Sequence, residues 1–324
     1  MASSHFSKVL KDVFRRASSP SRTTKARRIH LILDFDGTLT YSDTLAVLGN
    51  IQPTLTRPKP SLTWNEIAVA YIQDYSTHEA SYTPRKEDRR TLFQEREWLA
   101  SLAPIESCSA QRVEEAGTFT GVTSSDIEST ARKAVDDGSI KLRNGWQSLL
   151  TTGHDMDVSI MSVNWSRTFI KAVLLAAGAR VVDQSRFRLG ESLHKLQIHA
   201  NEIGGLEREG GSDGSLEGEI RTSGDKVRVM KEIGLGAEEK PTVVYVGDSN
   251  TDLECLVEAD VGICMRDVDM GSGQKSLAET LERLDIDVVP LDEITNQQEE
   301  GEGRKQLYWA SDFEGIGRLL GIAE

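Results

Sequence analysis

Cysteine is scarce in this sequence. The three cysteines, Cys108, Cys255 and Cys264, form no CxxC pair and leave an odd one over, which argues against a disulfide framework or a structural zinc site. We therefore expect a reducing compartment, by default the cytoplasm. No apolar run approaches the roughly 18 residues of a membrane span. Only 8 prolines accompany 38% hydrophobic and 27% charged residues, a composition typical of a soluble globular protein and not of a disordered one.

Acidic residues dominate most of the chain. The formal net charge is −13, yet residues 1–28 carry eight Lys or Arg and a single acid, Asp12, a local +7 that leaves −20 for the remainder. A body this acidic repels nucleic acid and anionic membranes, so neither is an expected partner. The basic, serine-rich start is typical of a mitochondrial presequence. The alternative is a disordered basic tail on a cytosolic protein.

The hydrophobic pattern divides the chain of 324 residues into two kinds of structure. A short apolar run at 29–33 predicts a strand that ends at the sequence Asp-Phe-Asp-Gly-Thr. From there to about residue 140 only helical spacing is found, with helices predicted near 62–75, 86–103, 108–117 and 124–137. We interpret 45–140 as an inserted, all-helical cap domain.

After Gly145 strands and helices alternate. Strands are predicted at 158–161, 179–183, within 196–203, and at 242–246, 261–264 and 287–290. Helices are predicted near 145–153, 166–177, 224–233, 251–258 and 274–284. The glycine-rich stretch 204–218 is interpreted as a loop or hairpin tip. The alternation predicts an α/β fold, a Rossmann-like parallel sheet with helices on both faces, formed by a core domain of 29–44 and 141–324.

Two pairs of aspartates follow predicted strands. Asp34 and Asp36 end the first strand at a spacing that sends both carboxylates to one side. Asp248 and Asp252 follow the strand 242–246 at a spacing that places both on one face where a helix begins. Ligands of open α/β sheets bind at the carboxyl ends of strands, so the four acids are expected to converge. Such a cluster repels itself unless a cation holds it, and hard oxygen ligands suit Mg²⁺.

Two further residues favour phosphate chemistry at this place. Ser162 ends the strand 158–161, where its hydroxyl and nearby backbone N–H groups can hold a phosphate oxygen. Lys226 begins a predicted helix, where a lysine in isolation is usually a solvated surface residue. Beside strand-end aspartates it can instead neutralise charge on a transferring phosphoryl group.

These motifs resemble a known family. The order of DFDGT, a strand-end serine, a DK pair and GDSNTD is similar to the four signature motifs of the haloacid dehalogenase superfamily, over residues 29–44 and about 142–290. The helical insertion resembles the cap of the phosphoserine-phosphatase-like branch. Within that branch the chain is most similar to fungal members, through Ser162-Val163-Asn164-Trp165-Ser166 and His199-Ala200-Asn201-Glu202.

The resemblance implies a role for each motif residue. Asp34 is expected to be the nucleophile that forms an aspartyl-phosphate, and Asp36 the acid and base that protonates the leaving oxygen and then activates water. Mg²⁺ is expected to bind Asp34, the backbone carbonyl of Asp36 and Asp248, with Asp252 as a ligand or a support. Ser162 and Lys226 are expected to hold the phosphoryl oxygens. An aspartate at position 36 favours phosphoryl transfer, because the dehalogenases of the superfamily lack it.

The segment after Ser162 departs from the branch, where a glycine usually follows. Here Asn164 is expected to contact substrate through its amide, and Trp165 either stacks on a substrate ring or packs in the core. Of the remaining candidates, Trp64, Tyr71 and Tyr75 either form the core of the cap or cover the substrate, and His154 and His199 are interpreted as surface or structural residues. Asn201 and Glu202 are expected near the mouth of the site.

The predicted function is Mg²⁺-dependent hydrolysis of a small phosphorylated metabolite. A closing cap excludes bulky polymers, and the branch suggests phosphoserine, thiamine monophosphate, pyridoxal phosphate or phosphocholine as substrates. A nucleotidase, with Trp165 as the base platform, is a variant of this prediction. Two alternatives stay open: a phosphotransferase that passes the phosphoryl group to an alcohol, and a non-catalytic binding protein that retains the fold.

Overall fold

The computed structural model describes residues 28–52, 59–151, 156–181, 185–218, 220–233, 240–295 and 306–322. The predicted basic segment therefore lies outside the described residues except for Arg28, and so does His154.

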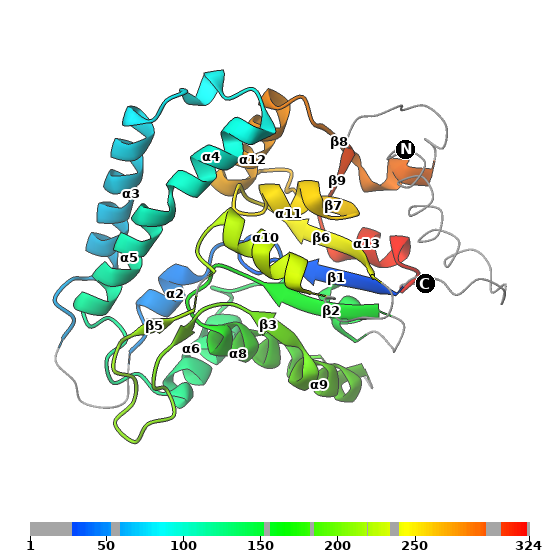
Figure 1. The fold of residues 1–324 in the computed structure, drawn as a ribbon. Helices are drawn as coiled ribbons and strands as arrows, with labels where there is room; N and C mark the ends of the chain where they lie inside the picture. Colours follow the sequence, from blue (N-terminus) through cyan, green and yellow to red (C-terminus); the bar gives the residue numbers. More distant parts are fainter. Residues whose placement is uncertain are drawn as a thin grey trace.

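A seven-stranded sheet forms the centre of the molecule, in the order β3-β2-β1-β6-β7-β9-β8, and all of its neighbouring strands are parallel (Figure 1). The strands of this sheet are β1 (Ile29–Leu33), β2 (Met156–Met161), β3 (Gln197–His199), β6 (Thr242–Gly247), β7 (Val261–Met265), β8 (Asp287–Pro290) and β9 (Gln306–Ala310). From β1 the chain adds strands first on one side and later on the other. The order therefore reverses beside β1 and β6, which is where ligands bind in open α/β sheets.

Alternating side chains of the strands supply two apolar layers. Leu31 and Leu33 of β1 belong to one buried cluster, together with Phe169 of the helix α8 (Arg167–Gly178). Ile32 points the other way, into a second buried cluster that contains Val229. Both faces of the sheet are thus covered, which confirms the predicted α/β class.

The remaining helices described in the core lie between these strands in sequence, except for the last one, which follows β9. They are α7 (Trp146–Leu150), α9 (Ser185–Lys195), α10 (Ser223–Glu232), α11 (Leu253–Glu258), α12 (Ser272–Arg283) and α13 (Phe313–Leu319), with a 3₁₀ turn, η2, at Leu291–Thr295.

Within the described part of residues 45–140, the regular elements are helices and a 3₁₀ turn. The elements are α2 (Leu45–Gly49), α3 (Trp64–Ser81), the 3₁₀ turn η1 (Lys86–Asp88), α4 (Leu92–Ser101), α5 (Ala103–Glu115) and α6 (Ser124–Asp136). Helices α3 and α5 contact each other and stand to one side of the sheet (Figure 1), whereas α6 packs against the core helix α8. Capping boxes at Thr63, Thr91 and Thr123 define where α3, α4 and α6 begin.

The strand predicted at 179–183 is wrong in the part that can be compared. Helix α8 ends at Gly178, and the N–H groups of Arg180 and Val181 bond back to the carbonyls of Ala177 and Gly178, at 3.1 and 3.2 Å, in a helical turn. Hydrogen bonds within this turn, and none to a neighbouring strand, are found for these two N–H groups, although valines such as Val181 favour strands.

Two elements near the C-terminus have no counterpart in the prediction. Strand β9 inserts between β7 and β8 and so moves β8 to the edge of the sheet, and α13 follows it. The predicted loop at 204–218 is a hairpin connection, because Leu216–Glu217 (β5) pairs antiparallel with Glu202–Ile203 (β4).

Candidate active site

Asp34 and Asp36 follow β1 at the carboxyl edge of the sheet. The N–H of Asp34 still bonds to the carbonyl of Val246 in β6, at 2.9 Å, so the strand fixes its backbone. The chain then turns tightly. The carbonyl of Phe35 accepts from the N–H groups three, four and five residues later, those of Thr38, Leu39 and Thr40, at 3.3, 2.9 and 3.0 Å. Asp34 is buried, and Asp36 is half-buried.

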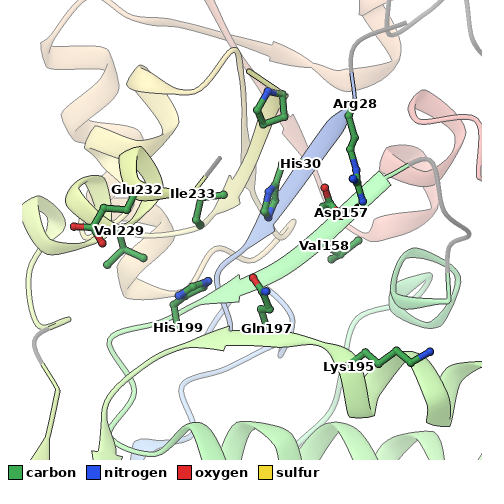
Figure 2. A pocket seen from close by; sticks show the side chains of 11 residues that line it. Arg28, His30, Asp157, Val158, Lys195, Gln197, His199, Val229, Glu232 and Ile233 are labelled. Carbon is green, nitrogen blue, oxygen red and sulfur yellow. Dashed lines mark hydrogen bonds and ion pairs between the residues drawn. The ribbon is translucent and has the colours of Figure 1, made fainter. Parts of the chain in front are cut away.

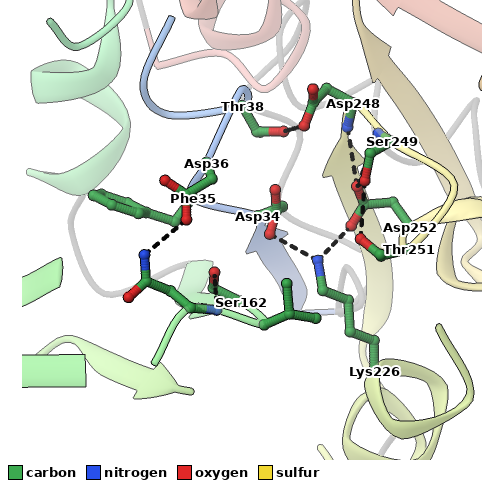
Figure 3. A network of polar contacts seen from close by, with 12 residues as sticks. Asp34, Phe35, Asp36, Thr38, Ser162, Lys226, Asp248, Ser249, Thr251 and Asp252 are labelled. Atoms are coloured by element: carbon green, nitrogen blue, oxygen red, sulfur yellow. Dashed lines mark hydrogen bonds and ion pairs between the residues drawn. The ribbon is translucent and has the colours of Figure 1, made fainter. Parts of the chain in front are cut away.

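Lys226 joins two of the predicted acids. A capping box of Thr222 and Asp225 starts α10 and holds Lys226 in its first turn. The fully buried Nζ lies 2.7 Å from Oδ1 of Asp34 and 2.7 Å from Oδ1 of Asp252 (Figure 3). Burial alone would lower the pKa of Lys226, but the carboxylates of Asp252 and Asp34 raise it, so the ammonium stays charged.

Three buried carboxylates gather beside this ammonium. One oxygen each of Asp34, Asp248 and Asp252 lies within 4.8 Å of the other two. Burial, opposed by Lys226 but reinforced by the other two acids, raises the pKa of Asp34 well above its usual range. Burial and Asp252 raise the pKa of Asp248 to about 7. The cluster therefore carries more negative charge than one lysine compensates, which is the electrostatic situation that a bound divalent cation relieves.

Asp252 has both carboxylate oxygens engaged by the protein. Oδ1 accepts from Lys226 and from the hydroxyl of Tyr245, each at 2.7 Å. Oδ2 accepts from the backbone N–H groups of Asp248 and Ser249 and from the Ser249 hydroxyl, each at 3.1 Å. Asp252 thereby shapes the loop that presents Asp248. Whether Asp252 is a ligand or a support stays a prediction.

Asp36 points away from the other acids. Its Oδ1 accepts from the N–H and the hydroxyl of Thr44, at 2.8 and 2.6 Å, and its Oδ2 accepts from Nδ2 of Asn164, at 2.8 Å (Figure 3). Burial and the nearby carboxylate of Asp43 outweigh these hydrogen bonds and raise the pKa of Asp36 to about 6. Two adjacent acids on one turn thus occupy different environments.

Asn164 is fully buried, and its amide holds Asp36. Besides Asp36, Nδ2 lies 3.3 Å from the hydroxyl of Thr44, and Oδ1 accepts from the N–H of Ser166 at 3.1 Å. The structure therefore gives Asn164 the position of a support for Asp36. The predicted contact of its amide with substrate stays a prediction.

Ser162 lies at the end of β2, beside β1. It is fully buried; its N–H donates to the carbonyl of His199 at 2.9 Å, and its hydroxyl accepts from the N–H of Asn164 at 3.1 Å. Figure 3 shows Ser162 next to Asp34 and Asp36 at the same edge of the sheet. Lys226 and three of the four predicted acids, Asp34, Asp248 and Asp252, thus come together beside Ser162. The expectation that all four acids converge is wrong for Asp36, because Thr44 and Asn164 hold its carboxylate.

Asn201 and Glu202 brace the segment after Ser162. Nδ2 of Asn201 donates to the carbonyls of Val163 and Asn164, at 3.1 and 3.2 Å. The Glu202 carboxylate accepts from the hydroxyls of Ser166 and Thr168, at 2.6 and 2.7 Å. The two sequence segments that carry the finer resemblance therefore contact each other.

The predicted aromatic residues pack together. Trp165 is half-buried, and its ring meets those of Trp64 and Phe119 edge-on, with centroids 5.6 and 6.2 Å away. Tyr75 packs edge-on against Trp98 at 5.9 Å, and the hydroxyl of Tyr71 donates to Glu106 at 2.7 Å. Trp165 thus joins the helical segment to the core; stacking on a substrate remains a prediction.

Three contributors were not found from the sequence. Thr44 bonds to Asp36, Tyr245 bonds to Asp252, and Arg143 bonds to the turn after Asp36. Tyr245 lies between Val244 and Val246 in a buried apolar strand. Because the hydroxyl of a buried tyrosine usually has a hydrogen-bond partner, this residue is the one whose role the sequence could have signalled. Neither Thr44 nor Arg143 belongs to a recognisable motif.

Replacing Gly37 with alanine is expected to damage the carboxylate cluster. Gly37 has φ +74°, and a Cβ there would clash with Oδ2 of Asp248. Gly138 has a similar φ, +79°, but its Cβ would meet only the Lys141 side chain, at 3.4 Å. Both alanine variants should lose about 1–2 kcal/mol of stability to backbone strain, and only Gly37→Ala should also weaken the binding of a divalent cation to the cluster, measured by calorimetric titration with Mg²⁺. Equal Mg²⁺ affinities in the two variants would contradict this.

The four sequence motifs meet at one edge of the sheet. Asp34 follows β1, Ser162 follows β2, Asp248 follows β6, and Lys226 reaches them from α10, so four motifs meet where the strand order reverses. This is the arrangement that the resemblance to the haloacid dehalogenase superfamily implies.

Comparisons with known proteins add distant relatives. No protein-family profile matches the chain. It is 26% identical over 283 residues to the bifunctional TH2 protein, mitochondrial, of Arabidopsis thaliana, covering 80% of this chain and 42% of that protein. It is also 26% identical to a CTO1 family protein of Schizosaccharomyces pombe, covering 87% of this chain and 96% of that one.

Solved structures show a distant likeness to the chain. A phosphoserine phosphatase with a phospho-aspartyl intermediate analogue aligns with 80% of this chain and 91% of its own, at 14% identity and a TM-score of 0.43.

No helix in the described parts of the chain is both long and apolar enough to cross a membrane.

A cavity of about 620 Å³ lies away from this site, at the amino ends of the strands (Figure 2). His30, His199 and Asp157 line it, and burial lowers the pKa of both histidines. Nε2 of His30 is 2.9 Å from the hydroxyl of Ser159. Because Asp34, Lys226, Asp248 and the other residues of the carboxylate cluster do not line this cavity, it is not the candidate active site.

Proposed function

We propose that this protein is a Mg²⁺-dependent phosphatase of small phosphomonoesters, acting through an aspartyl-phosphate. The observation that carries the proposal is the contact of Lys226 with both Asp34 and Asp252 at the reversal of strand order, beside Ser162. A buried ammonium within hydrogen-bond distance of a carboxylate can stabilise the charge that develops when that carboxylate attacks phosphorus.

Asp34 is the proposed nucleophile. Its backbone is fixed by β6, and one of its oxygens, Oδ1, is held by Lys226, so the carboxylate has a defined direction. Attack of Oδ2 on phosphorus forms the Asp34–phosphate bond and breaks the bond to the leaving alcohol oxygen. In this proposal Ser162 and Lys226 hold the phosphoryl oxygens.

Asp36 is the proposed acid and base. Thr44 and Asn164 orient its carboxyl, and its raised pKa, about 6, keeps a proton available near neutral pH. This proton goes to the leaving oxygen. The resulting carboxylate then takes a proton from the water that hydrolyses the aspartyl-phosphate, which regenerates Asp34 and releases phosphate.

The donor set fits Mg²⁺. Asp34 and Asp248 offer buried carboxylate oxygens whose raised pKa values reflect uncompensated negative charge, and the backbone carbonyl of Asp36 is the further expected ligand. Asp252, with both oxygens engaged, supports Asp248. A bound Mg²⁺ supplies charge neutralisation and polarises a phosphoryl oxygen.

Small substrates are favoured by the helical segment beside the core. Helices α3 to α5 stand beside the sheet, and α4 contacts α10, the helix that carries Lys226 (Figure 1). In the proposed function this segment is a cap that limits access to small metabolites. The chain spans 42% of the Arabidopsis relative, so nothing else of that bifunctional protein is assigned to it.

The test is phosphate release from a panel of small phosphomonoesters that includes phosphoserine, thiamine monophosphate, pyridoxal phosphate, phosphocholine and nucleoside monophosphates. We expect turnover of at least one member with Mg²⁺ and none with chelator. Added alcohols that lower free phosphate while turnover rises would identify a phosphotransferase instead. A folded protein that binds Mg²⁺ and phosphate but releases no phosphate from any member would favour the non-catalytic alternative.

A further inference from the structure

Arg143 lies where the chain returns from the helical segment to the core. The residues before Arg143 pair with the segment that follows β1. Thr40 and Leu142 form an antiparallel bridge, and the N–H of Tyr41 donates to the carbonyl of Lys141 at 3.0 Å. The N–H of Arg143 itself donates to the carbonyl of Leu39 at 2.9 Å. These bonds place its side chain beneath the turn that follows β1.

The guanidinium of Arg143 uses every one of its five N–H groups. Nε donates to the carbonyl of Thr38 at 3.0 Å, and Nη2 donates to the carbonyl of Gly37 at 2.9 Å and to Oδ2 of Asp267 at 2.8 Å. Nη1 donates to Oδ1 of Asp267 and, at 3.2 Å, to the carbonyl of Ser311. The side chain has no exposed surface.

These partners belong to three different loops at the carboxyl edge of the sheet. Gly37 and Thr38 follow β1, Asp267 follows β7, and Ser311 follows β9. Asp267 is fixed in turn by Nε2 of Gln274 in α12, at 2.9 Å. One side chain therefore sets the separation of the loops that surround the carboxylate cluster.

The same turn contacts Asp248 directly. The hydroxyl of Thr38 donates to Oδ1 of Asp248 at 3.1 Å, and Gly37 packs so closely on Asp248 that a Cβ would not fit. Two of the three backbone carbonyls that Arg143 holds thus belong to Gly37 and Thr38, which touch Asp248. A shift of this turn changes the distance between Asp248 and Asp34.

We propose that Arg143 is a positioning residue for the metal site, which sets the spacing between the nucleophile turn and Asp248. It acts through the backbone of Gly37 and Thr38 and touches neither substrate nor metal. The inference rests on one part of the proposed function, the binding of Mg²⁺ by the carboxylate cluster, and does not require phosphatase activity.

Lysine cannot replace this arginine. A planar guanidinium holds a carboxylate with two N–H groups and still directs the remaining three to carbonyls, whereas an ammonium has three donors and no fixed plane. Loss of a residue that orients metal ligands typically weakens metal binding about 10–100-fold. Arg143→Lys should therefore lower Mg²⁺ affinity even if the protein stays folded.

The test is calorimetric titration of the full chain with Mg²⁺, alongside thermal unfolding in chelator. The matched control is Arg89→Lys, because Arg89 is an equally buried arginine that pairs with Glu95 in the helical segment. We expect Mg²⁺ affinity to fall at least about tenfold in Arg143→Lys and to stay at the wild-type value in Arg89→Lys. Asp267→Asn retains the arginine but weakens the ion pair that anchors it, so its Mg²⁺ affinity should lie between those of wild type and Arg143→Lys. This variant replaces Arg143→Lys in the test if the lysine variant does not fold.

Each outcome decides the inference. Wild-type Mg²⁺ affinity in folded Arg143→Lys, or in Asp267→Asn where the lysine variant does not fold, overturns the positioning role and leaves the proposed phosphatase intact. A wild-type protein that binds no Mg²⁺ overturns both. Loss of affinity in Arg89→Lys as large as in Arg143→Lys would show a general effect of buried-arginine loss and would also overturn the inference.

Discussion

Replacing Asp34 with asparagine is expected to reduce phosphate release by at least about 10³-fold, because the variant has no carboxylate to attack phosphorus. The same change is expected to raise the melting temperature in chelator. At neutral pH the folded protein holds Asp34 among Asp248 and Asp252 in buried surroundings that raise its pKa well above the unfolded value.

The sign of the stability effect follows from that pKa. A carboxyl whose pKa is higher in the folded than in the unfolded state favours folding when it is protonated, so this acid destabilises the fold as pH rises above its unfolded value. Asparagine carries no charge at any pH and keeps the size of the side chain. Lys226 keeps its second partner, Asp252, in the variant.

The measurements are phosphate release with Mg²⁺ and thermal unfolding with and without chelator. The matched control is Asp157→Asn, on the neighbouring strand β2, whose side chain pairs with Arg28 and is 40% exposed; it should change neither turnover nor the melting temperature much. Turnover in Asp34→Asn close to that of wild type would contradict the proposed nucleophile. A marked fall of its melting temperature in chelator would contradict the electrostatic account of the cluster.

The core of the fold could be predicted because its signals are local. Buried parallel strands such as β1 and β6 appear as short apolar runs, and the helices between them show helical spacing and capping residues. Strand β9 was not predicted because its segment, from Gln306 to Ala310, contains polar groups among its apolar residues and follows an acidic stretch. Its place between β7 and β8 depends on pairing that no local pattern encodes.

The candidate site divides in the same way. Asp34, Asp36 and Asp248 are recognisable because each follows a strand in a short motif. Arg143 is not, because its partners Gly37 and Asp267 lie 106 and 124 residues away in sequence. A buried arginine that holds backbone carbonyls has no sequence signal apart from its residue type, and an arginine is more often exposed.

A second buried network fastens the helical segment to the core. The carboxylate of Glu95, in α4, is 1% exposed and accepts from Nε of Arg89 at 2.9 Å and from Nη1 of Arg283, in α12, at 2.8 Å. Nη1 of Arg283 also donates to the carbonyl of Arg89, and the Arg89 guanidinium lies 4.5 Å over the ring of Trp98. One carboxylate thus compensates two buried guanidinium groups.

Replacing Glu95 with glutamine is therefore expected to lower the free energy of unfolding by about 3–5 kcal/mol, because two buried cations lose their counter-charge. The matched control is Glu279→Gln, which breaks the exposed pair with Lys86, 2.7 Å apart, and should cost no more than about 1 kcal/mol. Urea unfolding of both variants measures the difference.

A third variant separates lost charge compensation from lost packing. Replacing Arg89, Glu95 and Arg283 together with apolar residues of similar volume removes the ions as well as their pairing. Because an intact buried ion pair contributes little more than well-packed apolar side chains, the triple variant should recover most of the stability that Glu95→Gln loses. If it is instead as unstable as Glu95→Gln, the network stabilises the junction of α4 with α12 through its specific hydrogen bonds, and uncompensated charge is not the cause.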